Sequence, residues 1–203
     1  MIVTNYTPED LKKLPLRAIV ALAARCARRV EALALLPDDD VEKVRVRSAV
    51  ANAIRLAEDF ANGLPCPSVE SVVQEVEACR AVVEADFVRD SAVGTAVLAA
   101  HAAATALHAL ALRGEPAESD MLGPTKPNPF PHLADVSADL AAADAFTAAL
   151  EAVGAERHTD SFTKAAIGDY QELLRLELGS YPQAGQPIDP SSKGPLGPLD
   201  PTS

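Results

Sequence analysis

The chain has 203 residues, a formal net charge of −11 and a sequence pI of about 4.8. This acidity argues against a general nucleic-acid binder and against docking on anionic membranes, because both need a basic surface, whereas it suits a basic protein partner. Alanine dominates the 48% of hydrophobic residues, aromatic residues make up 4%, and tryptophan is absent. This composition favours packed helices over sheets, so the predicted fold class is all-α, a single-domain bundle of about six helices.

The first two helices are predicted over residues 15–36 and 39–62. Pro15 suits a first helical turn, Pro37 ends the first helix, and Gly63 suits the end of the second. Apolar residues recur at helical spacing in both. The two stripes are Ile19, Leu22, Ala23, Cys26, Val30 and Leu33, and Val46, Ala49, Val50, Ala53, Ala57 and Phe60. The opposite face of the first helix carries Arg17, Arg25, Arg28 and Arg29.

A third helix is predicted over residues 68–85 and a fourth from residue 90 or 91 to about 113. Residues 91–112 carry no charge and are long enough to cross a bilayer. They are mostly alanine with threonine and histidine, which gain little from transfer into lipid. We therefore expect a buried helix at the centre of a water-soluble bundle and no membrane association.

Proline-rich stretches separate and follow the last two predicted helices, over residues 135–153 and 160–178. Residues 115–132 contain five prolines and are predicted to form a long loop. Residues 180–203 contain six prolines and are expected to be a tail that is either extended, laid over the bundle surface, or disordered, and that adds nothing to the core. The bundle domain would then cover residues 1–179, and removing the tail should leave the helical signal intact.

Three polar side chains share a stripe of the fourth helix, His101, Thr105 and His108. They either border the core with satisfied hydrogen bonds or line a ligand or partner pocket. The histidines are two turns apart, and the Glu-x-x-His pattern of di-iron bundles is absent. No hydrolase, nucleotide-binding or zinc-protease motif occurs either, so no catalytic residue, metal or cofactor is predicted.

The arginine face of the first helix also has two interpretations. Residues 1–55 carry ten Lys/Arg and seven Asp/Glu, which leaves −14 for the rest of the chain. On one interpretation the arginines pair with acidic neighbours such as Glu31 or Glu58 on a solvated face. On the other, Arg25, Arg28 and Arg29 dock an anion or an acidic peptide.

The cysteines and the start of the chain predict a cytoplasmic protein. Cys26, Cys66 and Cys79 are widely spaced and odd in number, as expected of reduced thiols, and the first residues lack the apolar core of a secretory signal. Cys66 lies between two prolines and is expected to be an inert surface thiol, whereas the other two fall on apolar helix faces.

Three stretches resemble a known family: ARCARRV at 24–30, followed by LPDD at 36–39; AIRLAEDFANG at 53–63; and AAHAAATALHA at 99–109. Together they look like the alanine-rich, all-helical immunity proteins of bacterial polymorphic toxin systems, over about the first 110 residues. The resemblance implies a non-enzymatic protein that binds and neutralises a cognate toxin, a basic one given the acidic charge, and no site residue is carried over. The alternatives are a small-ligand or metal-dependent enzyme with a pocket near His101 and His108, and a self-associating scaffold. The oligomeric state stays open.

Overall fold

The computed structural model describes residues 8–31, 41–66, 71–75, 78, 87–113 and 160–199. These residues form helices, turns and extended coil, with no strand among them, which confirms the all-α class. The helices are α1 (Pro8–Leu11), α2 (Leu16–Val30), α3 (Val41–Ala61), α5 (Phe87–Arg113) and α7 (Asp160–Arg175), and residues 71–75 are helical too. The predicted helix at 135–153 and the predicted loop at 115–132 lie outside the described residues.

Local signals explain where α3 ends. Gly63 adopts a left-handed φ of 72°, which a glycine reaches without a steric penalty. Its N–H donates to the carbonyl of Phe60 at 3.0 Å, and the N–H of Leu64 donates to the carbonyl of Asp59 at 2.8 Å. These bonds satisfy carbonyls at the helix end that have no partner within the helix.

The sequence did not predict α1, a single turn followed by the buried side chain of Leu14.

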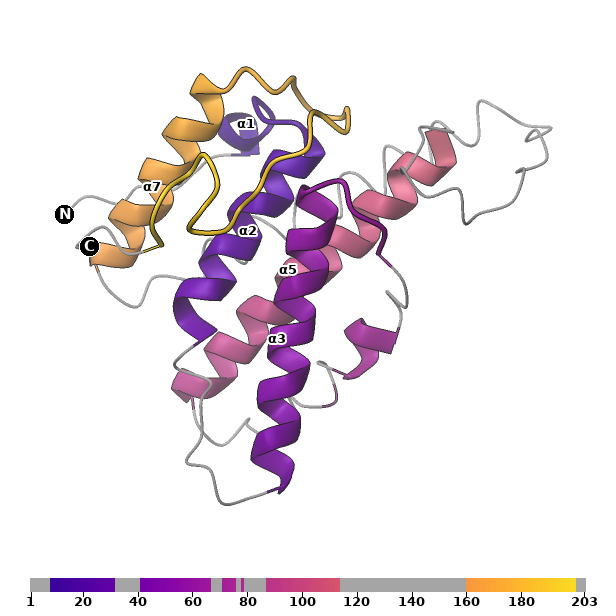
Figure 1. The fold of residues 1–203 in the computed structure, drawn as a ribbon, viewed down its shortest axis with the longest axis vertical. Helices are drawn as coiled ribbons and strands as arrows, with labels where there is room; N and C mark the ends of the chain where they lie inside the picture. Colours follow the sequence, from indigo (N-terminus) through magenta and orange to yellow (C-terminus); the bar gives the residue numbers. More distant parts are fainter. Residues whose placement is uncertain are drawn as a thin grey trace.

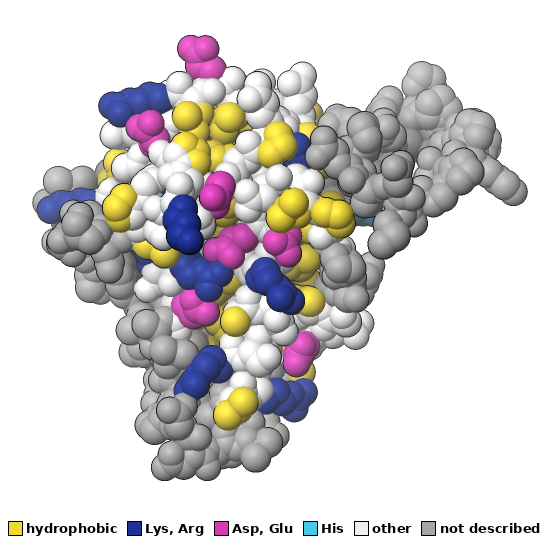
Figure 2. Space-filling view, viewed as in Figure 1, with side chains coloured by type: hydrophobic (Ala, Val, Ile, Leu, Met, Phe, Trp, Pro, Cys, Tyr) yellow, Lys and Arg dark blue, Asp and Glu magenta, His cyan; other side chains and the backbone are white. Residues whose placement is uncertain are grey.

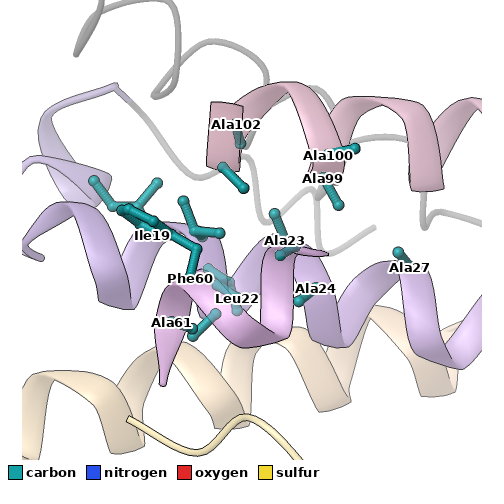
Figure 3. Packing of buried hydrophobic residues seen from close by; sticks show 14 of the residues in the cluster. Ile19, Leu22, Ala23, Ala24, Ala27, Phe60, Ala61, Ala99, Ala100 and Ala102 are labelled. Carbon is teal, nitrogen blue, oxygen red and sulfur yellow. The ribbon is translucent and has the colours of Figure 1, made fainter. Parts of the chain in front are cut away.

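Helix α2 occupies the middle of the described bundle. It lies between α3 and α7, with α5 packed across it (Figure 1). Alanines on α2 and α5 face each other, and Ile19 and Leu22 pack with Phe60 of α3 (Figure 3). Small side chains let the helices approach closely, so this core is built mainly from alanine with a few large aliphatic residues.

Helix α5 is buried as predicted, but the fully enclosed position belongs to α2. The outer stripe of α5, which includes Leu98, His101 and Thr105, is half-buried, and His108 is exposed. The window Val93–Leu110 is long and apolar enough to span a membrane by length and composition, and 67% of it is buried inside the bundle. A core helix of a soluble protein gives the same signal, so this window does not by itself indicate a membrane protein.

The described part of the tail, residues 180–199, is laid over the bundle. Figure 1 shows it returning from the end of α7 along α2. Ile188 and Leu196 belong to the buried core at 3% and 9% exposure, so the expectation that the tail adds nothing to the core is wrong. The N–H groups of Leu16 and Arg17 donate to the carbonyls of Gln183 and Ala184 at 2.9 and 3.0 Å. The tail therefore satisfies the first turn of α2, where backbone donors have no partner within the helix.

Candidate functional site

The densest polar cluster in the described structure joins α2 to α7. Arg25 and Arg29 lie one turn apart on α2, and both donate to Oδ2 of Asp169 on α7, Arg25 through Nε at 2.7 Å. The exposed fractions are 1% for Arg25, 8% for Arg29 and 5% for Asp169. Two guanidinium groups thus share one buried carboxylate.

Backbone carbonyls of the tail surround Arg25. Its Nη1 donates to the carbonyls of Pro190 at 2.9 Å, Gly197 at 3.1 Å and Ser191 at 3.4 Å, and its Nη2 donates to those of Pro198 at 2.9 Å and Leu196 at 3.4 Å. The Nε of Arg29 donates to the carbonyl of Leu199 at 2.9 Å. Carbonyl dipoles directed at a cation offset part of the cost of removing it from water. The cluster therefore fastens the tail to α2.

Arg28 points to the other side of α2 and forms the predicted acidic pairs. Its Nη2 and Nε donate to Glu58 at 2.6 and 3.1 Å, and its Nη1 donates to Glu31 at 2.8 Å. Partial burial lowers the pKa of Arg28, but the hydrogen bonds to Glu58 and Glu31 outweigh it and raise the pKa above the usual value. The interpretation as neighbour pairing is confirmed for this residue.

The solvated face predicted for the other arginines is wrong. Arg17, like Arg25 and Arg29, is buried, and its Nη1 donates to the carbonyl of Gly185 at 3.3 Å. The physical reason is the tail, whose carbonyls replace water as acceptors along α2. In the described part of the face drawn in Figure 2, basic and acidic side chains are interspersed and form no patch of one sign. The donors of Arg25 and Arg29 are thus directed at the chain itself.

The three polar side chains of the α5 stripe lie at the edge of the described core. The Thr105 hydroxyl donates to the carbonyl of His101 at 2.8 Å, so it bonds to its own helix backbone and not to an imidazole. His101 is half-buried and His108 exposed. Within the described ranges, no group of three His, Cys, Asp or Glu side chains could hold a metal ion.

Cys66 is half-buried, so the expected surface thiol is partly covered. Its Sγ donates to the carbonyl of Leu64 at 3.4 Å. Burial, with a smaller contribution from the Asp59 charge, raises the pKa of the Cys66 thiol to about 11. A thiol that stays protonated is a poor nucleophile, in line with the predicted inertness. Cys26 is buried in the core as predicted, and Cys79 lies outside the described residues.

Asp169 was not identified from the sequence, although a signal for it exists. The buried residues of α7 recur at helical spacing, and Asp169 falls within their stripe: Ala165, Ala166, Asp169, Tyr170 and Leu173. An acidic residue inside an apolar stripe must meet a cation or hydrogen-bond donors in the fold. The sequence leaves open which of these groups it meets.

No family model, no curated protein and no solved structure matches this chain.

Proposed function

We propose that this chain is a cytoplasmic, non-enzymatic helical protein-binding module that neutralises a basic toxic partner. The observation that carries the proposal is the distribution of charged residues along the chain. Three arginines of α2 are paired within the bundle, Arg25 and Arg29 with Asp169 and Arg28 with Glu58 and Glu31. Most of the acidic excess lies in two other stretches of the sequence: residues 114–159 contain eight Asp/Glu and two Lys/Arg, and residues 38–40 are all aspartate.

Such a distribution suits a partner that must be bound quickly. Opposite net charges steer two proteins together and raise the association rate well above that of a neutral pair, in a way that salt suppresses. A protein that protects against a toxin benefits from rapid association, because the toxin acts until it is bound. The resemblance of residues 24–30, 53–63 and 99–109 to immunity proteins supports the same function.

The test starts from the reading frames next to the one that encodes this chain. Each neighbour is expressed alone and together with this chain, and growth is followed. The proposal expects one neighbour to be toxic alone, to be tolerated in the presence of this chain, and to co-purify with it. Failure of this chain to relieve any toxic neighbour contradicts the proposal.

Association kinetics then test the electrostatic part separately. The association rate constant should fall steeply as ionic strength rises, whereas the dissociation rate constant should change little. A chain with the Asp and Glu residues of 114–159 replaced by Asn and Gln should associate more slowly. The matched control replaces an equal number of neutral polar residues elsewhere, and equal rates for the two variants would refute the role of the acidic segment.

A further inference from the structure

The arginine side of α2 forms a groove that the tail fills, first as an extended stretch over residues 184–190 and then as turns over residues 191–196. Three arginines of α2 donate to tail carbonyls in chain order: Arg17 to Gly185, Arg25 to residues 190–198, and Arg29 to Leu199. We call this row of three arginines the arginine ladder. Two apolar side chains of the tail, Ile188 and Leu196, are buried beside it. The N–H of Ile188 also donates to the carbonyl of Ala61 at the end of α3, at 2.8 Å.

The guanidinium donors of α2 and the backbone carbonyls of the tail are chemically complementary. A guanidinium has five N–H donors and no acceptor, whereas a proline-rich segment presents carbonyl acceptors and few N–H groups. Residues 184–190 are extended coil without helix or turn, and such a backbone leaves its carbonyls free to accept. The groove therefore recognises a proline-rich backbone and two apolar anchors.

The tail is joined to the bundle through one short connection. After α7 the chain turns sharply, with positive φ at Glu177 (49°) and Gly179 (110°). The contacts with the arginine ladder all lie beyond this turn, from Gly185 onward. These arginine contacts do not involve the connection, so a tail from another copy can make them as well. One weaker bond, from the N–H of Gln186 to the carbonyl of Leu178 at 3.4 Å, ties the tail to its own connection.

We propose that this groove is exchangeable between copies: residues 180–199 of a second copy of this chain dock on α2 in place of the chain's own tail. The product is a pair of chains with reciprocally exchanged tails, in which each cluster of Arg25, Arg29 and Asp169 is closed by carbonyls of the other chain. This inference is independent of the proposed toxin partner.

Two full-length variants with opposite defects test the exchange. Arg25→Met removes the central donor of the groove and leaves the tail intact. Ile188→Asp removes a tail anchor and leaves the groove intact. Lys193 is the sole trypsin site within residues 176–203. Its side chain is exposed, but Arg25 holds the chain on both sides of it, so faster cleavage there reports an undocked tail. Each variant alone should be cut rapidly at Lys193. When the two are mixed, the Arg25→Met chain should regain protection, since its intact tail enters the intact groove of the other chain.

The asymmetry of this result separates exchange from general stabilisation. Intact mass spectrometry should show protection of the Arg25→Met chain and not of the Ile188→Asp chain, and light scattering should give a species of twice the 21.2 kDa of one chain. A mixture in which both chains are cut as fast as they are alone overturns the proposal.

If either variant fails to fold, refolding of the unmodified chain decides the question. Refolding at high protein concentration should give a dimer that persists on dilution and reverts to monomer after unfolding and refolding in dilute solution. Ile188→Asp, refolded alongside where it folds, should stay monomeric. Monomer alone from the unmodified chain at every concentration overturns the proposal.

Discussion

Replacing Arg25 with methionine should be among the most damaging single changes in the described bundle. Methionine keeps much of the length and apolar stem of the side chain, so the change removes mainly the guanidinium. Arg25 is 1% exposed and donates to Asp169 and to five tail carbonyls. Three of these carbonyl bonds measure 3.1 Å or less.

The expected loss of stability follows from which groups lose their hydrogen-bond partner. A hydrogen bond to a charged group contributes about 1.5–3 kcal/mol, and such contributions do not add when the groups share one cluster. Asp169 keeps Arg29 as its counter-ion, so no isolated buried charge is created and the carbonyls bear most of the loss. We expect a fall of about 3–5 kcal/mol in the free energy of unfolding, which for a chain of this size lowers Tm by about 6–20 °C.

Urea unfolding followed by helical circular dichroism measures this difference. The matched control is Arg28→Met, which removes a half-buried guanidinium from Glu58 and Glu31 on the same helix and should cost about 1 kcal/mol. Asp169→Asn is the complementary variant, because it removes the carboxylate that both buried guanidinium groups share, and it should cost about 3–5 kcal/mol. Losses for Arg25→Met no larger than for Arg28→Met would refute the structural role assigned to the cluster.

Four further changes test other parts of the fold. Truncation after Gly179 should lower Tm at least as much as Arg25→Met, since it removes every tail carbonyl from α2, in contrast to what the sequence alone suggests. Gly194→Ala should cost about 1–3 kcal/mol, because the added Cβ would lie 2.0 Å from a backbone oxygen. Gly168→Ala on α7 has nothing within 4 Å of the added Cβ and should stabilise the fold by about 0.5–1 kcal/mol. Equal urea midpoints for the two variants would contradict this. The Cys66 thiol, with its pKa raised from 9.0 to about 11, should react slowly with a disulfide reagent at pH 8. Because the unfolded thiol ionises first, folding stability should fall as pH rises from about 9 to 11, and Cys66→Ser should remove that part of the decline.

The helices themselves were predictable because their signals are local. The apolar stripe of α3 from Val46 to Phe60 is buried as its spacing predicts, and Gly63 ends the helix as expected. Such signals depend on residues three or four positions apart and on turn geometry, which the sequence displays directly.

The environment of Arg25 was not predictable by the same means. Its partners are 144 to 173 positions away, and most of them are backbone carbonyls, which every residue carries. A hydrophobic pattern assigns arginine to solvent, so it fails where main-chain acceptors replace water. Only Asp169 left a trace in the sequence, as an acidic residue within an apolar stripe.

The dependence of α2 on the tail has a consequence during translation. Helix α2 leaves the ribosome early, while the carbonyl of Pro198 that Arg25 binds is made 173 residues later. At ordinary elongation rates this delay is about 9–35 s. Throughout it the arginines of α2 have only water as acceptors where the tail will lie, so the nascent bundle must wait, partly assembled, for its last docking segment. Such long-range closure should make folding slower than in helical proteins of simple up-and-down connectivity.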